Sequence, residues 1–269
     1  MALQGLTELA DHVFVYEVRG PIVVNSAIIV GDDGVAVVDT GTVESDAQLI
    51  LEALASVTDK PLRYVINTHH HGDHTFGNWW LLPAVVVGHA SCRLRLIGEL
   101  GAQHREALAG LVPMVREQIQ SIPIVAPDLT FQEQVRVHLG NLTLRLDYFG
   151  RAHTDNDIAI AVEEPSLSFA GDLIEESGPP ITFEAYPQDW GSTLRQLEKV
   201  AESRFIPGHG REVDRAFVSF QAQGFEELAV ACAAAPTVEA ALASIPAASR
   251  EVLGHHAESA VQRYFVTAR

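Results

Sequence analysis

The sequence is poor in cysteine and in basic residues. Cys92 and Cys232 are the only cysteines among 269 residues, which excludes a disulfide scaffold and favours reduced, helix-borne structural thiols. Lys and Arg total 18 against 35 Asp and Glu, a formal net charge of −17, so binding to nucleic acid or to an anionic membrane surface is disfavoured. The longest apolar runs, such as residues 22–30, have the length of strands and fall well short of the roughly 20 residues that span a bilayer.

The N-terminal residues, Met1–Gly5, contain neither a basic segment nor an apolar one, so we expect no secretory signal. Together with the two reduced cysteines, this predicts a cytoplasmic protein. Hydrophobic residues make up 47% of the chain and charged residues 20%, the composition of an ordinary folded domain.

Short β-rich runs alternate with amphipathic helical patterns along the chain. Strands are expected at 13–17, 22–30, 35–39, 62–67, 85–88, 135–138, 143–149, 158–162, 167–170 and 204–206. Helices are expected at about 45–56, 90–120 with a break at Pro113, 190–202, and from about 213 onward with breaks at Pro236 and Pro246. The absence of a linker predicts a single domain over 1–269, with a helical insertion at about 90–120 and a helical C-terminal segment at about 213–269. This organisation fits two packed sheets with helices outside.

The histidines are concentrated at one place in the sequence. His69, His70, His71 and His74 lie within six positions, with Asp73 among them, directly after a predicted buried strand. A loop leaving a strand turns alternate side chains to one point, so His69 and His71 can share a metal. Asp73 and His74 fall on the next turn and can reach a second metal, whereas His70 should point away. Imidazole and carboxylate are the ligands that zinc prefers.

Three further polar residues follow predicted strands at glycine-flanked turns: His153, Asp172 and His209. Polar groups placed directly after buried strands line a site at the edge of a sheet. The other histidines lack such a context and are expected on the surface or in packing: His12, His89, His104, His138, His255 and His256.

In this order, the chain resembles the metallo-β-lactamase-fold hydrolase superfamily over roughly residues 25–215. The resemblance rests on the Asp39-Thr40-Gly41 turn, the Thr68–His74 motif and the three later turns. It implies an α/β fold, the four-layer αβ/βα sandwich of this superfamily, and a metal-dependent hydrolase.

The resemblance also assigns roles to the candidate ligands. One metal is expected on His69, His71 and His153, a second on Asp73, His74 and His209, and Asp172 between them. The expected cofactor is two Zn²⁺, with iron or manganese as alternatives. A hydroxide between the metals would be the nucleophile, and Asp73 would orient it. Asp39 would fix a ligand histidine by a hydrogen bond, although Asp-Thr-Gly is equally a plain turn signal.

Departures from individual subfamilies narrow the expected reaction. Asp172 stands where true metallo-β-lactamases carry cysteine or serine, so β-lactam hydrolysis is expected only as a minor activity. Glu175 stands where the resembling lactonases carry tyrosine, and the basic glutathione-binding surface of glyoxalase II has no counterpart. What remains is the hydrolysis of an ester, lactone, thioester or phosphoester bond.

Two other interpretations stay open. One is an iron-dependent oxidoreductase on the same fold, resembling persulfide dioxygenases, and the other is a non-catalytic protein stabilised by metal. The complete second set of ligands, Asp73, His74 and His209, favours the binuclear hydrolase.

Aromatic residues near the motif are candidates for the substrate pocket: Trp79, Phe183, Tyr186 and Trp190. They would suit an aromatic or acyl substrate, although Trp79 and Trp190 fit a packing role equally well. The strong negative charge favours a neutral or monoanionic small molecule as substrate. The helices at 90–120 are candidates for a lid, for simple scaffold or for the surface of a homodimer.

Overall fold

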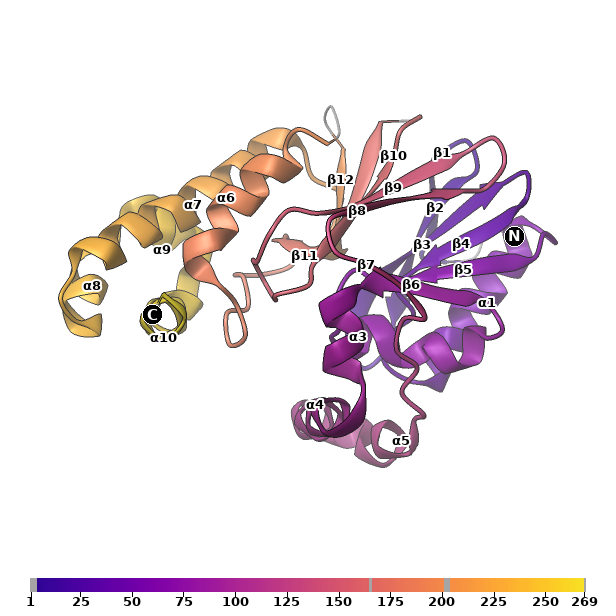
Figure 1. Cartoon of the computed structure of the whole chain (residues 1–269), viewed down its shortest axis with the longest axis horizontal. Coiled ribbons are helices and arrows are strands. Elements are labelled where there is room, and N and C mark those ends of the chain that lie inside the picture. Colours follow the sequence, from indigo (N-terminus) through magenta and orange to yellow (C-terminus); the bar gives the residue numbers. More distant parts are fainter. Residues whose placement is uncertain (1–3, 165, 201–203, 269) are drawn as a thin grey trace. The chain divides into compact units, whose positions relative to one another are not determined.

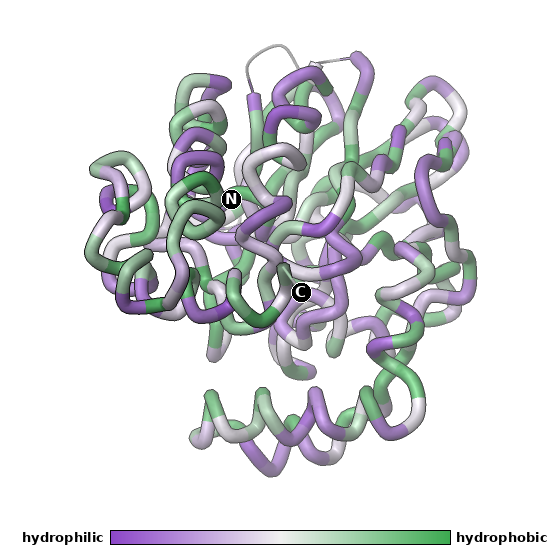
Figure 2. The backbone as a smooth tube through the Cα atoms, turned by 60° about the vertical axis from the view of Figure 1, so that its left-hand side comes forward, coloured by the Kyte–Doolittle hydropathy of each residue, from purple (hydrophilic) through white to green (hydrophobic). Residues whose placement is uncertain are grey.

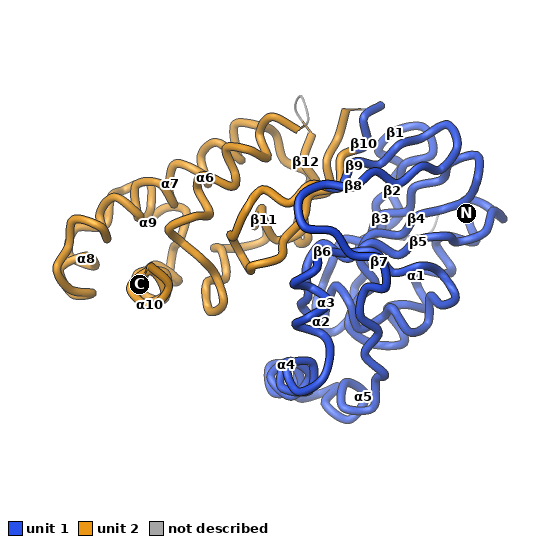
Figure 3. The backbone as a smooth tube through the Cα atoms, viewed as in Figure 1, with its two compact units in different colours: residues 1–146, 162–165 blue, residues 147–161, 166–269 orange. Residues whose placement is uncertain are grey.

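The computed structural model describes residues 4–164, 166–200 and 204–268. It has a mixed α/β fold with two β-sheets and helices (Figure 1), which confirms the predicted fold class. The chain divides into two compact units, unit 1 with residues 1–146 and 162–165, and unit 2 with residues 147–161 and 166–269 (Figure 3). The single domain stays a prediction.

Unit 1 contains a seven-stranded sheet whose strands follow one another in chain order. The strands are β1 (Leu6–Ala10), β2 (Val13–Arg19), β3 (Val23–Gly31), β4 (Gly34–Val38), β5 (Leu62–Ile66), β6 (Val85–His89) and β7 (Leu129–Phe131). Neighbours from β1 to β4 are antiparallel, and those from β4 to β7 are parallel. The switch occurs where α1 (Glu44–Val57) joins β4 to β5, because parallel neighbours need a crossover connection.

The core of unit 1 lies between this sheet and α1. Ala47, Ile50 and Ala53 recur every three residues on α1 and are fully buried, so they form one apolar face. They pack in a cluster that includes Ile28 and Val37 of the sheet. Strands β3 and β4 therefore end at fixed positions, and the residues after β4 are held rigidly.

The predicted helical insertion consists of four short elements. They are α3 (Ala90–Leu96), α4 (Gly98–Leu111), η2 (Pro113–Val115) and α5 (Arg116–Ser121). The break at Pro113 is confirmed, but the sequence did not predict the earlier break at Gly98, whose φ of +60° suits glycine. These elements enclose a second apolar cluster with Phe76 and Cys92.

The other sheet has five strands in the order β12-β11-β10-β9-β8. They are β8 (Gln134–His138), β9 (Thr143–Tyr148), β10 (Ile158–Val162), β11 (Leu167–Glu175) and β12 (Phe205–His209). The structure corrects the expected end of β11, which continues past Ala170 and contains Asp172. Strand β11 stays in the sheet because every one of its residues is buried and β12 pairs with it in parallel, with irregular register around Gly171.

Helices form most of the rest of unit 2. They are α6 (Pro187–Leu197), α7 (Arg215–Ala234), α8 (Val238–Ser244), α9 (Ala247–Leu253), η3 (Gly254–His256) and α10 (Ala257–Thr267). Hydrophobic and hydrophilic residues are interspersed along the chain (Figure 2). Helices α6 and α7 lie side by side. The predicted helix 190–202 begins earlier, at Pro187, and α6 ends at Leu197; residues 201 and 202 of the prediction lie outside the described residues.

Both cysteines are buried free thiols on helices, Cys92 on α3 and Cys232 on α7. Burial raises the pKa of the Cys232 thiol to about 11, which makes it a poor nucleophile. Among the residues that the structure describes, no helix combines the length and apolar character needed to cross a membrane.

Candidate metal centre

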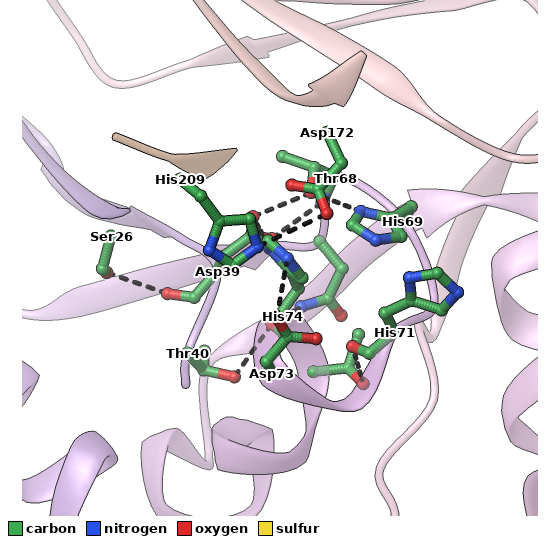
Figure 4. A network of polar contacts seen from close by, with 12 residues as sticks. Ser26, Asp39, Thr40, Thr68, His69, His71, Asp73, His74, Asp172 and His209 are labelled. Carbon is green, nitrogen blue, oxygen red and sulfur yellow. Dashed lines mark hydrogen bonds and ion pairs between the residues drawn. The ribbon is translucent and has the colours of Figure 1, made fainter. Parts of the chain in front are cut away.

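The histidine motif follows β5 and runs into the short helix α2 (Gly72–Thr75), where His71 caps the N-terminus. His69, His71, Asp73 and His74 are all buried. The ring centroids of His69 and His71 are 4.7 Å apart, and those of His69 and His74 are 4.3 Å apart. Asp73 Oδ2 lies 3.4 Å from His74 Nε2. The structure thus brings together the four ligands that the sequence predicts in this motif (Figure 4).

Asp39 lies directly after β4 and holds this motif. Its φ of +58° is in the left-handed region, which aspartate tolerates better than most residues. In this conformation its carboxylate accepts hydrogen bonds from Thr68 N and Thr68 Oγ1, both at 2.8 Å. His74 Nδ1 lies 2.7 Å from the same carboxylate (Figure 4). Asp39 therefore makes the contact with a candidate ligand that the resemblance implies.

This contact determines which nitrogen atoms carry protons. The Asp39 carboxylate can only accept, so His74 donates through Nδ1–H. The Thr68 hydroxyl proton goes to Asp39, so the Thr68 oxygen accepts from His69 Nδ1, which is 3.1 Å away. Both histidines keep their Nε2 lone pair for a metal. Burial raises the pKa of the Asp39 carboxyl, and the bonds from His74 and Thr68 oppose this shift.

A network of neutral polar groups makes hydrogen bonds to the backbone carbonyl of His74. Asn67 Nδ2 donates to the His74 carbonyl at 3.1 Å, and Asn78 Nδ2 donates to Asn67 Oδ1 at 2.8 Å. Thr40 N also donates to the His74 carbonyl, at 3.0 Å. Gly77 lies so close to Thr40 that an added Cβ would be 1.9 Å from the Thr40 carbonyl oxygen. The sequence pattern does not predict this role for Asn67 and Asn78, although both flank the histidine motif.

His70 and His104 were not expected to have ligand roles, and they pack together near His71. The His104 ring, from α4, is stacked on His71 with centroids 5.6 Å apart and planes 12° from parallel. The His70 and His104 centroids are 5.1 Å apart. His104 therefore has a packing role, as predicted, but the residue it packs on is a candidate ligand. Only tertiary structure places this helical residue there.

Unit 2 brings together the three remaining predicted ligands. His209 is the last residue of β12, the parallel neighbour of β11, which carries Asp172. His153 comes from the loop between β9 and β10. Asp172 Oδ2 lies 3.4 Å from His209 Nε2 and 3.6 Å from His153 Nε2. One oxygen of Asp172 thus faces the Nε2 atom of His153 and the Nε2 atom of His209.

These spacings fit a divalent metal. Two donor atoms bound tetrahedrally at about 2.1 Å from one zinc ion are about 3.4 Å apart. The three pairs within the units, Asp73 with His74 and Asp172 with each of its histidines, are separated by 3.4 to 3.6 Å. Asp172 contributes to two of these pairs through one oxygen. The residues of both units therefore fit metal ions in donor type, burial and spacing.

Glu176 holds the turn that follows His209. Its Oε2 accepts a 2.8 Å hydrogen bond from Arg211 N, and its Oε1 accepts one of 2.9 Å from the Arg211 guanidinium. The bond from the backbone of Arg211 lowers the pKa of Glu176, with the Arg211 guanidinium contributing. Gly210 has a φ of +93°, a conformation that glycine permits at this turn.

The candidate pocket residues differ in their exposure. Trp79 and Phe183 are 47% and 58% exposed, and Tyr186 has the Arg151 guanidinium 4.5 Å from its ring centroid. Trp190 is fully buried, stacks on Phe225 at 4.3 Å and donates from Nε1 to the Leu173 carbonyl. The suggestion that Trp190 lines the pocket is therefore corrected: it belongs to the core. The other three stay predictions.

Residues 19–209 match the family model of the metallo-beta-lactamase superfamily. The match includes the histidine motif and all three unit 2 ligands. The chain belongs to the metallo-beta-lactamase superfamily.

Curated relatives of this superfamily member are hydrolases. It is 29% identical over 162 residues to the hydroxyacylglutathione hydrolase of Methylococcus capsulatus, a match that covers 60% of this chain and 52% of that protein. It is 20% identical over 217 residues to the metallo-beta-lactamase type 2 of Bacteroides fragilis, covering 77% and 79%. The matched region spans about half the length of the Methylococcus relative.

Solved structures share the fold. A metallo-beta-lactamase from Pontibacter korlensis superposes with a TM-score of 0.65 at 18% identity, covering 82% of this chain and 98% of that chain. The likeness extends over most of the chain and establishes the fold of this superfamily.

Proposed function

We propose that this protein is a binuclear zinc-dependent hydrolase that cleaves an ester-type bond, with a thioester as the first candidate. The observation that carries the proposal is the position of Asp172 Oδ2, which faces Nε2 of both His153 and His209 at metal-ligand spacing. A buried carboxylate oxygen with an imidazole nitrogen on each side is a donor set of the kind that zinc prefers.

The proposed ligand sets combine residues of both units. His69, His71 and His153 would hold one metal, Asp73, His74 and His209 would hold the other, and Asp172 would contact both. Support comes from each unit separately, through the burial and spacing of its own residues. Further support comes from the superfamily match, which spans all seven positions.

Two bound divalent ions would supply an ionised water near neutral pH and would polarise the substrate carbonyl. Within the chain, Asp73 is the residue placed to orient that water and to accept its proton, because its carboxylate lies beside His74 Nε2. Asp39 keeps His74 in the tautomer with Nε2 free by accepting from Nδ1. The protein thus prepares its nitrogen donors before any ion binds.

One of the curated relatives favours a thioester substrate, while another is a metallo-beta-lactamase type 2. The Methylococcus relative is a hydroxyacylglutathione hydrolase, whereas the solved neighbours are similar in fold alone. The exposed aromatic side chains of Trp79 and Phe183 would suit an acyl group. The net charge of −17 favours a neutral or monoanionic small molecule, and we propose β-lactam hydrolysis only as a minor activity.

The test is elemental analysis of protein purified without added metal, followed by a panel of thioester, ester, lactone, phosphodiester and β-lactam substrates. We expect about two zinc ions per chain and hydrolysis that a chelator abolishes and zinc restores. One iron per chain with oxygen consumption would instead support the oxidoreductase. Protein that binds no metal would contradict both.

A further inference from the structure

Glu175 is a buried carboxylate that has no role in the proposed reaction. It is the last residue of β11, three positions after Asp172, and it is 6% exposed. Its Oε1 lies 3.8 Å from His153 Nδ1. The other ring nitrogen of His153, Nε2, lies 3.6 Å from Asp172 Oδ2. The imidazole therefore stands between two carboxylates of the same strand.

Two helices hold this end of β11 in place. Glu175 N donates to Gln221 Oε1 on α7 at 3.1 Å, and Gln221 Nε2 donates to the Leu173 carbonyl at 2.9 Å. Trp190 Nε1 on α6 donates to the same carbonyl at 3.0 Å. The Trp190 ring also meets the His153 ring edge to face, with centroids 5.7 Å apart. The backbone that carries Glu175 and the ring that it faces are thus both fixed by the core of unit 2.

A buried charge at this place has an energetic cost. Removing a carboxylate from water destabilises the fold unless a partner compensates for the lost hydration. Glu175 faces the imidazole of His153, which is neutral when it binds a metal. The Glu175 carboxylate is stabilised most when the Nδ1–H group of His153 becomes a more polar donor. This happens when Nε2 of the same ring coordinates a cation.

We propose that Glu175 is a positioning residue that holds His153 with Nδ1 protonated and turned toward itself, so that Nε2 is presented to a metal. The inference rests on the proposed metal binding, and it assigns Glu175 to the affinity of the metal site rather than to substrate. Carboxylates that accept from a ligand histidine fix its tautomer and raise its basicity, and their loss costs about 10–100-fold in metal affinity or activity.

The experiment measures Zn²⁺ affinity by competition with a chromophoric chelator, together with thermal unfolding of the metal-free proteins. Wild type is compared with Glu175→Gln, which removes the charge and keeps the shape, and with Glu175→Asp, which keeps the charge. Glu251→Gln is the matched control, because Glu251 is exposed on α9 of the same unit.

We expect Glu175→Gln to weaken zinc binding about 10–100-fold while the metal-free protein melts at the same temperature or higher, since a buried charge is gone. Glu175→Asp should bind zinc more tightly than Glu175→Gln, and Glu251→Gln should match wild type. Unchanged zinc affinity in Glu175→Gln would overturn the proposal. A lower melting temperature of the metal-free Glu175→Gln protein without weaker binding would show a structural role and would also overturn it.

If Glu175→Gln does not fold, ¹⁵N spectra of the zinc-loaded wild type provide the test. Zinc on His153 Nε2 with a protonated Nδ1 is expected, and zinc on Nδ1 would refute the inference. The zinc titration uses no substrate, so it tests Glu175 independently of the reaction. A wild type that binds zinc but hydrolyses nothing in the separate substrate panel would contradict the proposed function alone. Equal zinc binding by wild type and Glu175→Gln would contradict only the role of Glu175.

Discussion

The two units carry their candidate ligands in different ways. In unit 1 the ligands come from a single short motif, and His69 and His74 are both oriented through one buried carboxylate, that of Asp39. In unit 2 His153, Asp172 and His209 come from three separate segments, and the pairing of β11 with β12 sets the positions of Asp172 and His209. A contiguous motif is organised by a local network, whereas dispersed ligands depend on the register of a sheet.

The two units differ in how many candidate ligands a single substitution should disturb. A change at Asp39 should disturb two histidines together, since Thr68 links it to His69 and a direct bond links it to His74. In unit 2, separate carboxylates serve separate segments: Glu175 faces His153, and Glu176 holds the turn after His209. A single change at Glu175 or at Glu176 should therefore affect one candidate ligand at a time.

The largest expected effects come from removing one ligand in each unit. Asp73→Asn and His153→Ala should each lower kcat/KM by about 10²–10⁴-fold, because each would remove a proposed metal ligand and Asp73 is also proposed to orient the water. Circular dichroism should show that both variants keep their fold. Unchanged turnover in both would contradict the proposed site, and loss in only one would show that the two units do not contribute equally.

Asp39→Asn tests the shared carboxylate of unit 1. Asparagine also tolerates the left-handed backbone at φ +58°, so the change removes charge without adding strain. We expect zinc affinity to fall about 10–100-fold, with both metals weakened, because two histidines lose their oriented partner. Metal content after dialysis against a graded chelator measures this, and the loss of one metal only would argue against a shared role.

Glu176→Gln should have a smaller effect, on stability. The pKa of Glu176 is lowered in the folded protein, so its contribution is present above the ordinary glutamate pKa and is lost as the pH falls through the folded-state pKa. We expect unfolding in urea at pH 7 to show a loss of roughly 1 kcal/mol, which disappears in acid.

Arg211→Ala separates the two bonds that Glu176 accepts. It keeps the backbone N–H bond and removes only a guanidinium whose side chain is 89% exposed, so it should cost less than Glu176→Gln. A larger cost for Arg211→Ala would mean that the ion pair holds the turn.

The smallest expected signal is thiol reactivity in the native protein. Cys92 lies in the core of unit 1 and Cys232 in the core of unit 2, so each reports on one unit. Both should react with a thiol reagent at least about 10²-fold more slowly than in denatured protein, since reaction requires local opening. Quantification of each labelled peptide as urea rises would show whether the units open together, and fast native labelling of either would contradict its burial.

Much of the fold could be predicted from residue patterns. Strands β3 and β4, helix α1 and the breaks at Pro236 and Pro246 lie close to where the sequence predicts them. Strands β1 and β7 were not predicted, because both are short and none of their residues is fully buried. Asp172 was expected after its strand and lies within it, because pairing with β12 extends β11 beyond the run that β propensity alone indicates.

The sequence by itself determined the donor chemistry: imidazoles and carboxylates of the right kind, in the order of this superfamily. Residue type and local spacing carry that information. Only tertiary structure decided that His74 Nδ1 faces Asp39, that Trp190 belongs to the core, and that Glu175 faces His153. These depend on contacts between residues distant in sequence, and such contacts form only when strands and helices pack.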